Sequence, residues 1–199
     1  MMSSMLIAGL LSYLLGSIPN GLWLGKAIWH TDLREHGSHN IGATNAWRTL
    51  GKPAGISIFL LDFAKGALSV YLGSLLVGTP AFMIVCGILA IVGHSCSLFL
   101  KFRGGKGVAT GLGVMVMLMP LPALLVFLIW LILVKLTGYV SLGSIVAAAC
   151  VPLLAWLMNY DLPFILFGLL AAVFIIVRHH SNIGRLLNGT ESKIQAAKR

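Results

Sequence analysis

Residues 30–52 form a polar segment between two apolar stretches, and they carry side chains that bind phosphate groups in proteins. The segment reads HTDLREHGSHNIGATNAWRTLGK. Hydroxyl, amide and guanidinium groups donate hydrogen bonds to anions, and the glycines allow the backbone to turn its N–H groups toward a ligand. An ordinary solvated loop that needs small polar residues for its turns is the alternative. The candidate residues are Ser38, His39, Asn40, Thr44, Asn45 and Arg48.

A second polar segment, residues 101–107, reads KFRGGKG and leads directly into an apolar stretch. Glycines and a lysine just before a helix bring together backbone N–H groups, the positive end of the helix dipole and an ammonium group, which is an anion site. The segment lacks the spacing of a nucleotide-binding P-loop. A basic cap that only orients the chain in a membrane is the alternative. The candidate residues are Gly104, Gly105, Lys106 and Gly107.

The third candidate segment, RHHSNIGRLLNGTE, spans residues 178–191 after the last apolar stretch. If it is helical, His179, Asn182 and Arg185 follow one another at three-residue intervals and share a flank of the helix. His179 is able to donate to a phosphate or to transfer a proton. A histidine that anchors the chain at a membrane interface is the alternative.

Polar residues also occur inside two apolar stretches. Asp62 and Lys65 lie three residues apart, and charges within a membrane face a polar cavity or each other. They either form a helical ion pair with a packing role or line the floor of a polar site. Asn20 in the sequence SIPNG marks either a break that faces a polar pocket or a simple proline kink.

The elements that hold these segments are predicted to be transmembrane helices. Of the 199 residues, 58% are apolar and only 10% are charged, whereas soluble domains carry about 25% charged residues. We therefore expect an all-α, polytopic integral membrane protein. Residues 1–199 should form a single membrane-embedded domain, in which 180–199 are a cytoplasmic tail.

The number and direction of the spans follow from length and charge. Crossing a bilayer takes about 20 apolar residues, and Pro120 and Pro122 break the stretch 107–136 into two short pieces. The stretch is either one long kinked span or a tight pair of short spans. A pair of short spans places all of the 14 basic residues except Lys65 at or near one side, as the positive-inside rule requires. We predict about seven spans, an outer N-terminus, a cytoplasmic C-terminus and an active site at the cytoplasmic face. The net charge of +9 is then a topology signal and does not indicate nucleic acid binding. The other predicted spans are 5–29, 53–77, 80–100, 139–158 and 162–178.

Several kinds of site are missing from the sequence. Cys86, Cys96 and Cys150 lie in apolar stretches without metal-ligand spacing, so we predict neither a metal nor a cofactor. No H-x₄-D pair and no G-x-S-x-G nucleophile turn occurs.

Taken together, the motifs resemble those of the acyl-phosphate:glycerol-3-phosphate acyltransferase family of bacterial membranes. The resemblance is carried, in order, by SIPNG, GSHNIGATNAWR, LDFAKG, FRGGKGVAT and RHHSNIGRLLNGTE, and it covers essentially the whole chain. It implies transfer of a fatty acyl group from acyl phosphate to the 1-position of sn-glycerol 3-phosphate. The products would be lysophosphatidate and phosphate, in phospholipid biosynthesis.

The resemblance also implies roles for individual residues. The catalytic set is Ser38, Arg48, Lys106, His179 and Asn182. The predicted substrate-binding set is Asn40, Thr44, Asn45, Gly104, Gly105, Gly107 and Arg185. The sequence departs from the family where it has His39, since glycine is expected there.

The expected partners are glycerol 3-phosphate, acyl phosphate and membrane lipid, and a soluble enzyme that makes acyl phosphate is a candidate partner. The expected location is the bacterial inner membrane. Because acyl phosphate is already activated, the enzyme mainly has to position the substrates and stabilise charge. The proton acceptor is either the donor's own phosphate or His179. A membrane transporter for a phosphorylated small anion is the alternative function.

Overall fold

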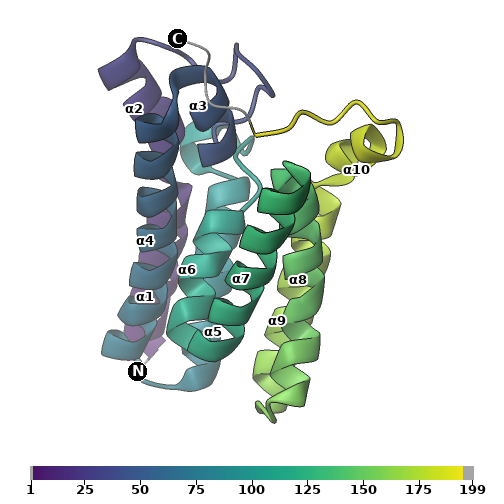
Figure 1. Ribbon diagram of the computed structural model, residues 1–199. Helices are drawn as coiled ribbons and strands as arrows, with labels where there is room; N and C mark the ends of the chain where they lie inside the picture. The colour runs from purple at the N-terminus through teal and green to yellow at the C-terminus, as the bar shows by residue number, and fades with distance from the viewer. Residues whose placement is uncertain (1, 195–199) are drawn as a thin grey trace. The chain divides into compact units, whose positions relative to one another are not determined.

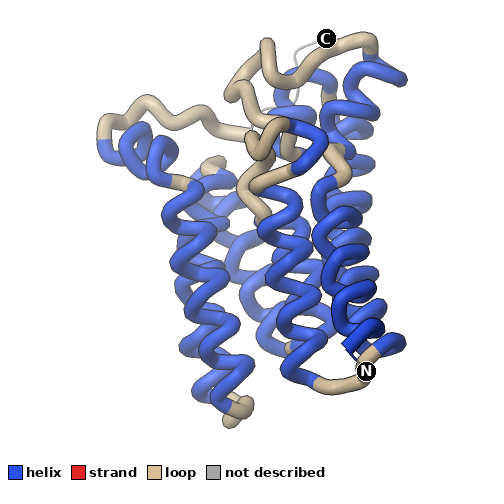
Figure 2. Tube along the Cα trace, turned by 180° about the vertical axis from the view of Figure 1, so that it is seen from behind, coloured by secondary structure: helices blue, strands red, loops and turns tan. Residues whose placement is uncertain are grey.

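All regular structure in residues 2–194, the part of the chain that this computed structural model describes, is helical (Figure 2). The described residues divide into two compact units, 2–114 and 115–194, and each is described by itself. The single-domain expectation for residues 1–199 stays a prediction. Residues 195–199 of the expected tail lie outside the described residues.

Long apolar helices build the first unit (Figure 1). Helix α1 (Met2–Ser17) is bent by 43° relative to α2 (Asn20–Trp29), because Pro19 between them lacks an N–H group for the helix ladder. Helix α4 (Lys52–Leu76) and α5 (Pro80–Ser95) both pack against α1. The short turn η1 (Leu98–Leu100) follows α5.

Glycines set the close approach of α1 to α5. A β-carbon on Gly16 would collide with the carbonyl oxygen of Ala90, and one on Gly93 would collide with that of Tyr13. Small residues allow two helix backbones to come this close inside a membrane, where apolar burial alone does not drive helices together.

The first polar segment lies at the end of the first unit away from the N-terminus (Figure 1). Its C-terminal part forms helix α3 (Ala43–Leu50). Buried residues Leu33, Ala46, Ala54 and Ile58 form an apolar cluster that fixes α3 against α4. A second cluster joins α2, the first segment and η1 through Leu22, Ile41 and Leu100.

The ambiguous stretch 107–136 contains two separate helices, α6 (Val108–Leu118) and α7 (Pro120–Thr137). The chain leaves helical geometry at Met119, with φ −143° and ψ 72°, and Pro120 and Pro122 follow at the start of the next helix, where proline is tolerated. The stretch therefore forms two helices, as expected, and the two membrane spans predicted for it stay a prediction.

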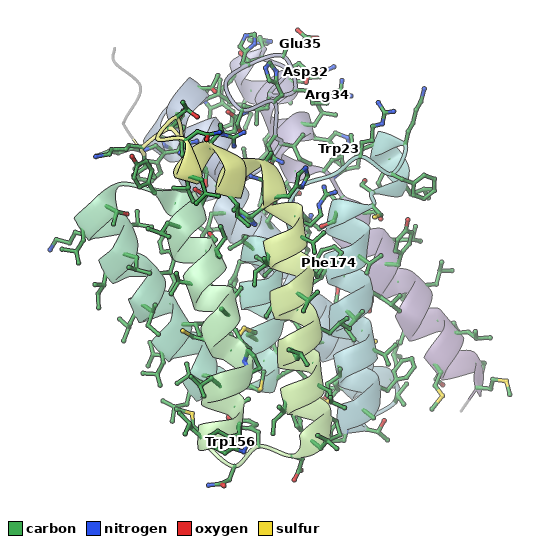
Figure 3. The ribbon with its side chains drawn as sticks, turned by 90° about the vertical axis from the view of Figure 1, so that its right-hand side faces the viewer. Trp23, Asp32, Arg34, Glu35, Trp156 and Phe174 are labelled. Carbon is green, nitrogen blue, oxygen red and sulfur yellow. The ribbon has the colours of Figure 1, made fainter. Side chains whose placement is uncertain are left out.

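The second unit consists of α7, α8 (Val140–Leu157), α9 (Leu162–Arg178) and α10 (His180–Leu187), with α8 packed against α7 and α9. Helix α10 is bent by 60° from α9. Trp156 lies near the α8–α9 turn, at the other end of α9 from α10 (Figure 3). Tryptophan is common at membrane interfaces.

Four helices in the described residues are long and apolar enough to cross a membrane, and the two bent pairs raise this number to six. Helix α6 is apolar but has only 11 residues. Large apolar side chains on the outside of these helices are exposed, as Leu60, Leu68 and Leu75 on α4 illustrate. A surface of this kind requires lipid around it.

Candidate active site

Asn45, on the first turn of α3, organises the first polar segment. Its side chain is only 2% exposed. The amide nitrogen donates to the carbonyl oxygens of Leu33, His36 and Asn40 at 3.0, 3.0 and 2.8 Å. The amide oxygen accepts the N–H of Ser38 at 2.9 Å. Asn45 thus shapes the loop that carries Ser38, and the predicted substrate contact of Asn45 stays a prediction.

The loop turns through two residues with positive φ. A β-carbon on Gly37 (φ 60°) would collide with the amide oxygen of Asn45, so glycine is required for this contact. His39 has φ 56°, and its Nδ1 lies 2.9 Å from the carbonyl oxygen of Arg34. Glycine adopts this backbone conformation more easily than other residues, which accounts for the glycine expected at this position. Ser38, between them, is exposed.

The remaining candidates of the first segment lie at and within α3. The side-chain oxygen of Asn40 accepts the N–H of Gly42 at 2.9 Å, just before the helix begins. Thr44 and Arg48 are both half-buried and lie four residues apart, so they share one flank of α3. The apolar cluster beneath α3 fixes the direction of this flank.

One carboxylate pairs with two other cations of this region. Asp32 lies 2.6 Å from Arg34 and 3.0 Å from Lys26. The Arg34 side chain holds the pKa of Asp32 well below its usual range against the opposing effect of burial, and the Arg34 N–H and Lys26 add to the lowering. Asp32 and Arg34 lie together on the loop in Figure 3. Arg34 and Lys26 are thus engaged with Asp32.

The glycines of the second segment allow close packing. Gly104 donates its N–H to the carbonyl oxygen of Ser95 at 2.9 Å, and Gly105 donates to that of His94 at 3.1 Å. We expected these two N–H groups to face an anion, whereas both are engaged by the end of α5. Lys106 and Gly107 (φ 81°) follow and lead into α6. The catalytic role of Lys106 and the substrate-binding roles of the three glycines stay predictions.

A buried polar cluster lies within the first unit. Asp62 Oδ1 accepts hydrogen bonds from Lys65 Nζ at 2.9 Å and Asn20 Nδ2 at 3.0 Å, and Lys65 Nζ also donates to the carbonyl oxygen of Ile18 at 2.8 Å. His94 Nδ1 lies 3.7 Å from Asp62 Oδ1. Asp62 and Lys65 are each 3% exposed. The ion pair forms as one of our two readings expected, and Asn20 at the break of the first span joins it.

In the second unit, Glu191 is a buried carboxylate that accepts several hydrogen bonds, as Asp62 does in the first unit. It accepts hydrogen bonds from Ser141 at 2.7 Å, Asn182 at 2.6 Å and Arg185 at 2.7 Å. Burial raises the pKa of Glu191, but these three donors outweigh burial and lower it overall. Two predicted site residues, Asn182 and Arg185, are therefore positioned by a carboxylate that we did not single out. His94 was also missed.

His179 is buried between α9 and α10, with 3% exposure. Its Nδ1 lies 2.8 Å from the carbonyl oxygen of Ile175. Because a carbonyl only accepts hydrogen bonds, Nδ1 carries a proton and donates it to this carbonyl oxygen. His179 and Asn182 come from adjacent turns across the bend, and the imidazole is oriented through Nδ1 by a carbonyl group.

The candidate residues form two groups. In the first unit, the cluster of Leu22, Ile41 and Leu100 packs the first segment against η1, which directly precedes the second segment. In the second unit, α10 groups His179, Asn182 and Arg185 with Glu191. Among residues 2–194, no group of three or more His, Cys, Asp or Glu side chains is placed to hold a metal ion.

Comparisons with known proteins find similarity to one family over almost the entire chain. The model of the family described as glycerol-3-phosphate acyltransferase matches residues 6–189. The glycerol-3-phosphate acyltransferase of Synechococcus sp. (strain JA-3-3Ab) is 46% identical, with 96% of this chain and 94% of the relative covered. That of Carboxydothermus hydrogenoformans is 45% identical, with 97% and 98% covered.

Solved structures match as well. The crystal structure of PlsY (YgiH), an integral membrane glycerol 3-phosphate acyltransferase, in its glycerol 3-phosphate form is similar with a TM-score of 0.91 and 38% identity, covering 96% of both chains. The lysophosphatidic acid form has a TM-score of 0.88 and 37% identity, covering 96% of this chain and 95% of the other.

Proposed function

The chain belongs to the glycerol-3-phosphate acyltransferase family, and we propose that it acylates glycerol 3-phosphate at the 1-position with acyl phosphate as the donor. It is an integral membrane acyltransferase of phospholipid synthesis. The observation that carries the assignment is the whole-length similarity to a structure in its glycerol 3-phosphate form. The choice of acyl phosphate is supported by the predicted cations Arg48 and Lys106, which suit a donor that carries a phosphate group.

The reaction makes few chemical demands on the protein. The 1-hydroxyl oxygen attacks the acyl carbonyl carbon, the bond from that carbon to the phosphate oxygen breaks, and phosphate leaves. We propose that Arg48 and Lys106 stabilise phosphate charge, and that Ser38, His179 and Asn182 position the reacting groups. The predicted substrate contacts are assigned to Asn40, Thr44, Asn45, Gly104, Gly105, Gly107 and Arg185.

The proton acceptor follows from the setting of His179. A histidine base is normally oriented by a carboxylate that stabilises its charged form, whereas His179 donates to a carbonyl group. This favours the donor phosphate as the proton acceptor. Nε2 of His179 then serves as a hydrogen-bond partner of the substrate.

Seven spans, an outer N-terminus and a cytoplasmic active site and C-terminus complete the proposal, together with the bacterial inner membrane as location. The positive-inside rule supports this topology. Thr49→Cys and Ile194→Cys, each in a background without Cys86, Cys96 and Cys150, should both react with an impermeant reagent from the cytoplasmic side only. Opposite sidedness of the two positions would exclude seven spans.

The direct test of the reaction uses purified protein, acyl phosphate and labelled glycerol 3-phosphate. We expect lysophosphatidate and one phosphate per turnover, and we expect Arg48→Ala or Lys106→Ala to lower the rate at least ~100-fold. Lys26→Ala, an exposed cation of the same unit, should stay near the parent rate. A transporter would instead move a phosphorylated anion into vesicles without forming lysophosphatidate.

A soluble enzyme that makes acyl phosphate is the proposed source of the donor.

A further inference from the structure

His94 connects the buried polar cluster to the second polar segment, and none of the roles assigned above uses it. It lies in the last turn of α5 and is 5% exposed. On one side of its ring, Nδ1 is 3.7 Å from Asp62 Oδ1. This distance is too long for a hydrogen bond, but it places the ring directly beside the carboxylate.

The other side of the ring lies against Gly105. A β-carbon on Gly105 would collide with Nε2 of His94, and the ring carbons beside it are the next atoms that it would meet. The backbone of the same histidine accepts the Gly105 N–H at 3.1 Å. The ring and the carbonyl group of His94 therefore both contact Gly105 and fix its position.

We propose that His94 is a positioning residue for the segment Gly104–Gly107, and that Asp62, Lys65 and Asn20 hold its ring in place. Through this contact the cluster sets where Lys106 and the start of α6 meet a substrate phosphate. The inference rests on the proposed function, because it assigns a purpose to a contact beneath the predicted phosphate-binding segment.

The cost of the cluster argues for a purpose beyond stability. Replacing a buried ion pair by apolar residues of similar size is often neutral or stabilising, so a pair that only filled space would have no advantage over apolar packing. Lys65 is not the only neighbour of the Asp62 carboxylate, since Asn20 and His94 also approach the same oxygen. The negative charge thereby fixes groups from α2 and α5.

The steric contact offers a sharp test. We expect Gly105→Ala to push the ring away and to raise the KM for a phosphate-bearing substrate by up to roughly 100-fold, with kcat less affected. His94→Ala should raise the same KM. Because shortening His94 removes the ring atoms that the added methyl group would meet, the double variant should be no worse than the worse single variant.

Gly104→Ala is the matched control. A β-carbon on Gly104 would meet the carbonyl oxygen of His94 and the backbone of Ser95, which His94→Ala leaves unchanged. The effects of Gly104→Ala and His94→Ala should therefore multiply. If the effects of Gly105→Ala and His94→Ala multiply as well, the ring contact has no positioning role.

The cluster itself is tested by two further variants, with melting temperature in detergent as a second readout. Asp62→Asn leaves Lys65 buried without its counter-charge and should lower both stability and substrate affinity. Asp62→Asn with Lys65→Met should regain stability but keep the raised KM. Recovery of both would make the cluster a merely structural ion pair and overturn the proposal. Absence of lysophosphatidate from the parent protein would instead overturn the proposed function.

Discussion

In each unit one buried polar side chain organises a group of candidate residues, but the two side chains differ in charge and in what they bind. Asn45 is neutral, and its four hydrogen-bond partners are all backbone groups. Glu191 is ionised, and its three partners are side chains. Asn45 therefore determines the path of a loop, whereas Glu191 determines the position of functional groups on a helix.

This difference predicts different failures. Loss of Asn45 should disorder the backbone that carries Ser38, with no direct dependence on pH. Loss of Glu191 should leave this loop unchanged, but Asn182 and Arg185 lose their common acceptor and α10 is held less firmly. Protonation of Glu191 should have a similar effect.

The largest effect is expected for Asn45→Asp. The substitution replaces a donor by a charged oxygen that faces three carbonyl oxygens in a buried site, where an unmatched polar group is strongly unfavourable. We expect at least a ~100-fold loss of kcat/KM. Asn40→Ala, which removes one hydrogen bond to Gly42, should cost no more than roughly tenfold. Similar effects of both variants in a steady-state assay would contradict the central role of Asn45.

Glu191→Gln should have a smaller effect, about 30-fold in kcat/KM, because the charge-assisted bond to Arg185 is weakened while an acceptor for Ser141 remains. Ser141→Ala removes one donor and leaves the charge, so its effect should be smaller still. Equal effects of Glu191→Gln and Ser141→Ala would show that the negative charge is unimportant.

His179→Gln should lower kcat by less than about tenfold and act mainly on KM, since glutamine keeps a hydrogen-bonding side chain at the site. His180→Gln, at the exposed neighbour whose Nδ1 lies 3.0 Å from the Val177 carbonyl, should be near normal. If His179→Gln binds glycerol 3-phosphate normally but turns over negligibly, His179 is the general base.

The smallest expected effect is a pH dependence of the local stability of α10. Because the pKa of Glu191 is lower in the folded state than its ordinary value of 4.5, its contribution to stability is complete above that value. The contribution declines as the pH falls toward the pKa of the folded state. Hydrogen exchange, corrected for intrinsic rates, should show α10 amides losing protection on acidification. In Glu191→Gln this loss should be much weaker, and an identical loss would exclude Glu191 as its cause.

The sequence by itself determined the class of protein and the places where its chemistry lies. Long apolar stretches without charges require a membrane around the protein. They can be read from the sequence because they depend only on residues that follow one another along the chain. The two pieces of 107–136 follow from two prolines. The motifs also identified the family. Asp62 and Lys65 were readable as a pair because three residues along a helix bring side chains to one flank.

Only the tertiary structure decided which polar groups meet. Glu191 contacts Ser141 50 residues away, and Asn20 contacts Asp62 42 residues away. No local spacing relates such pairs. The N–H groups of Gly104 and Gly105 illustrate the same limit, since the motif showed that glycine was needed but not why. The reason is the closeness of His94, which depends on how α5 packs in the first unit and cannot be read from the order of residues.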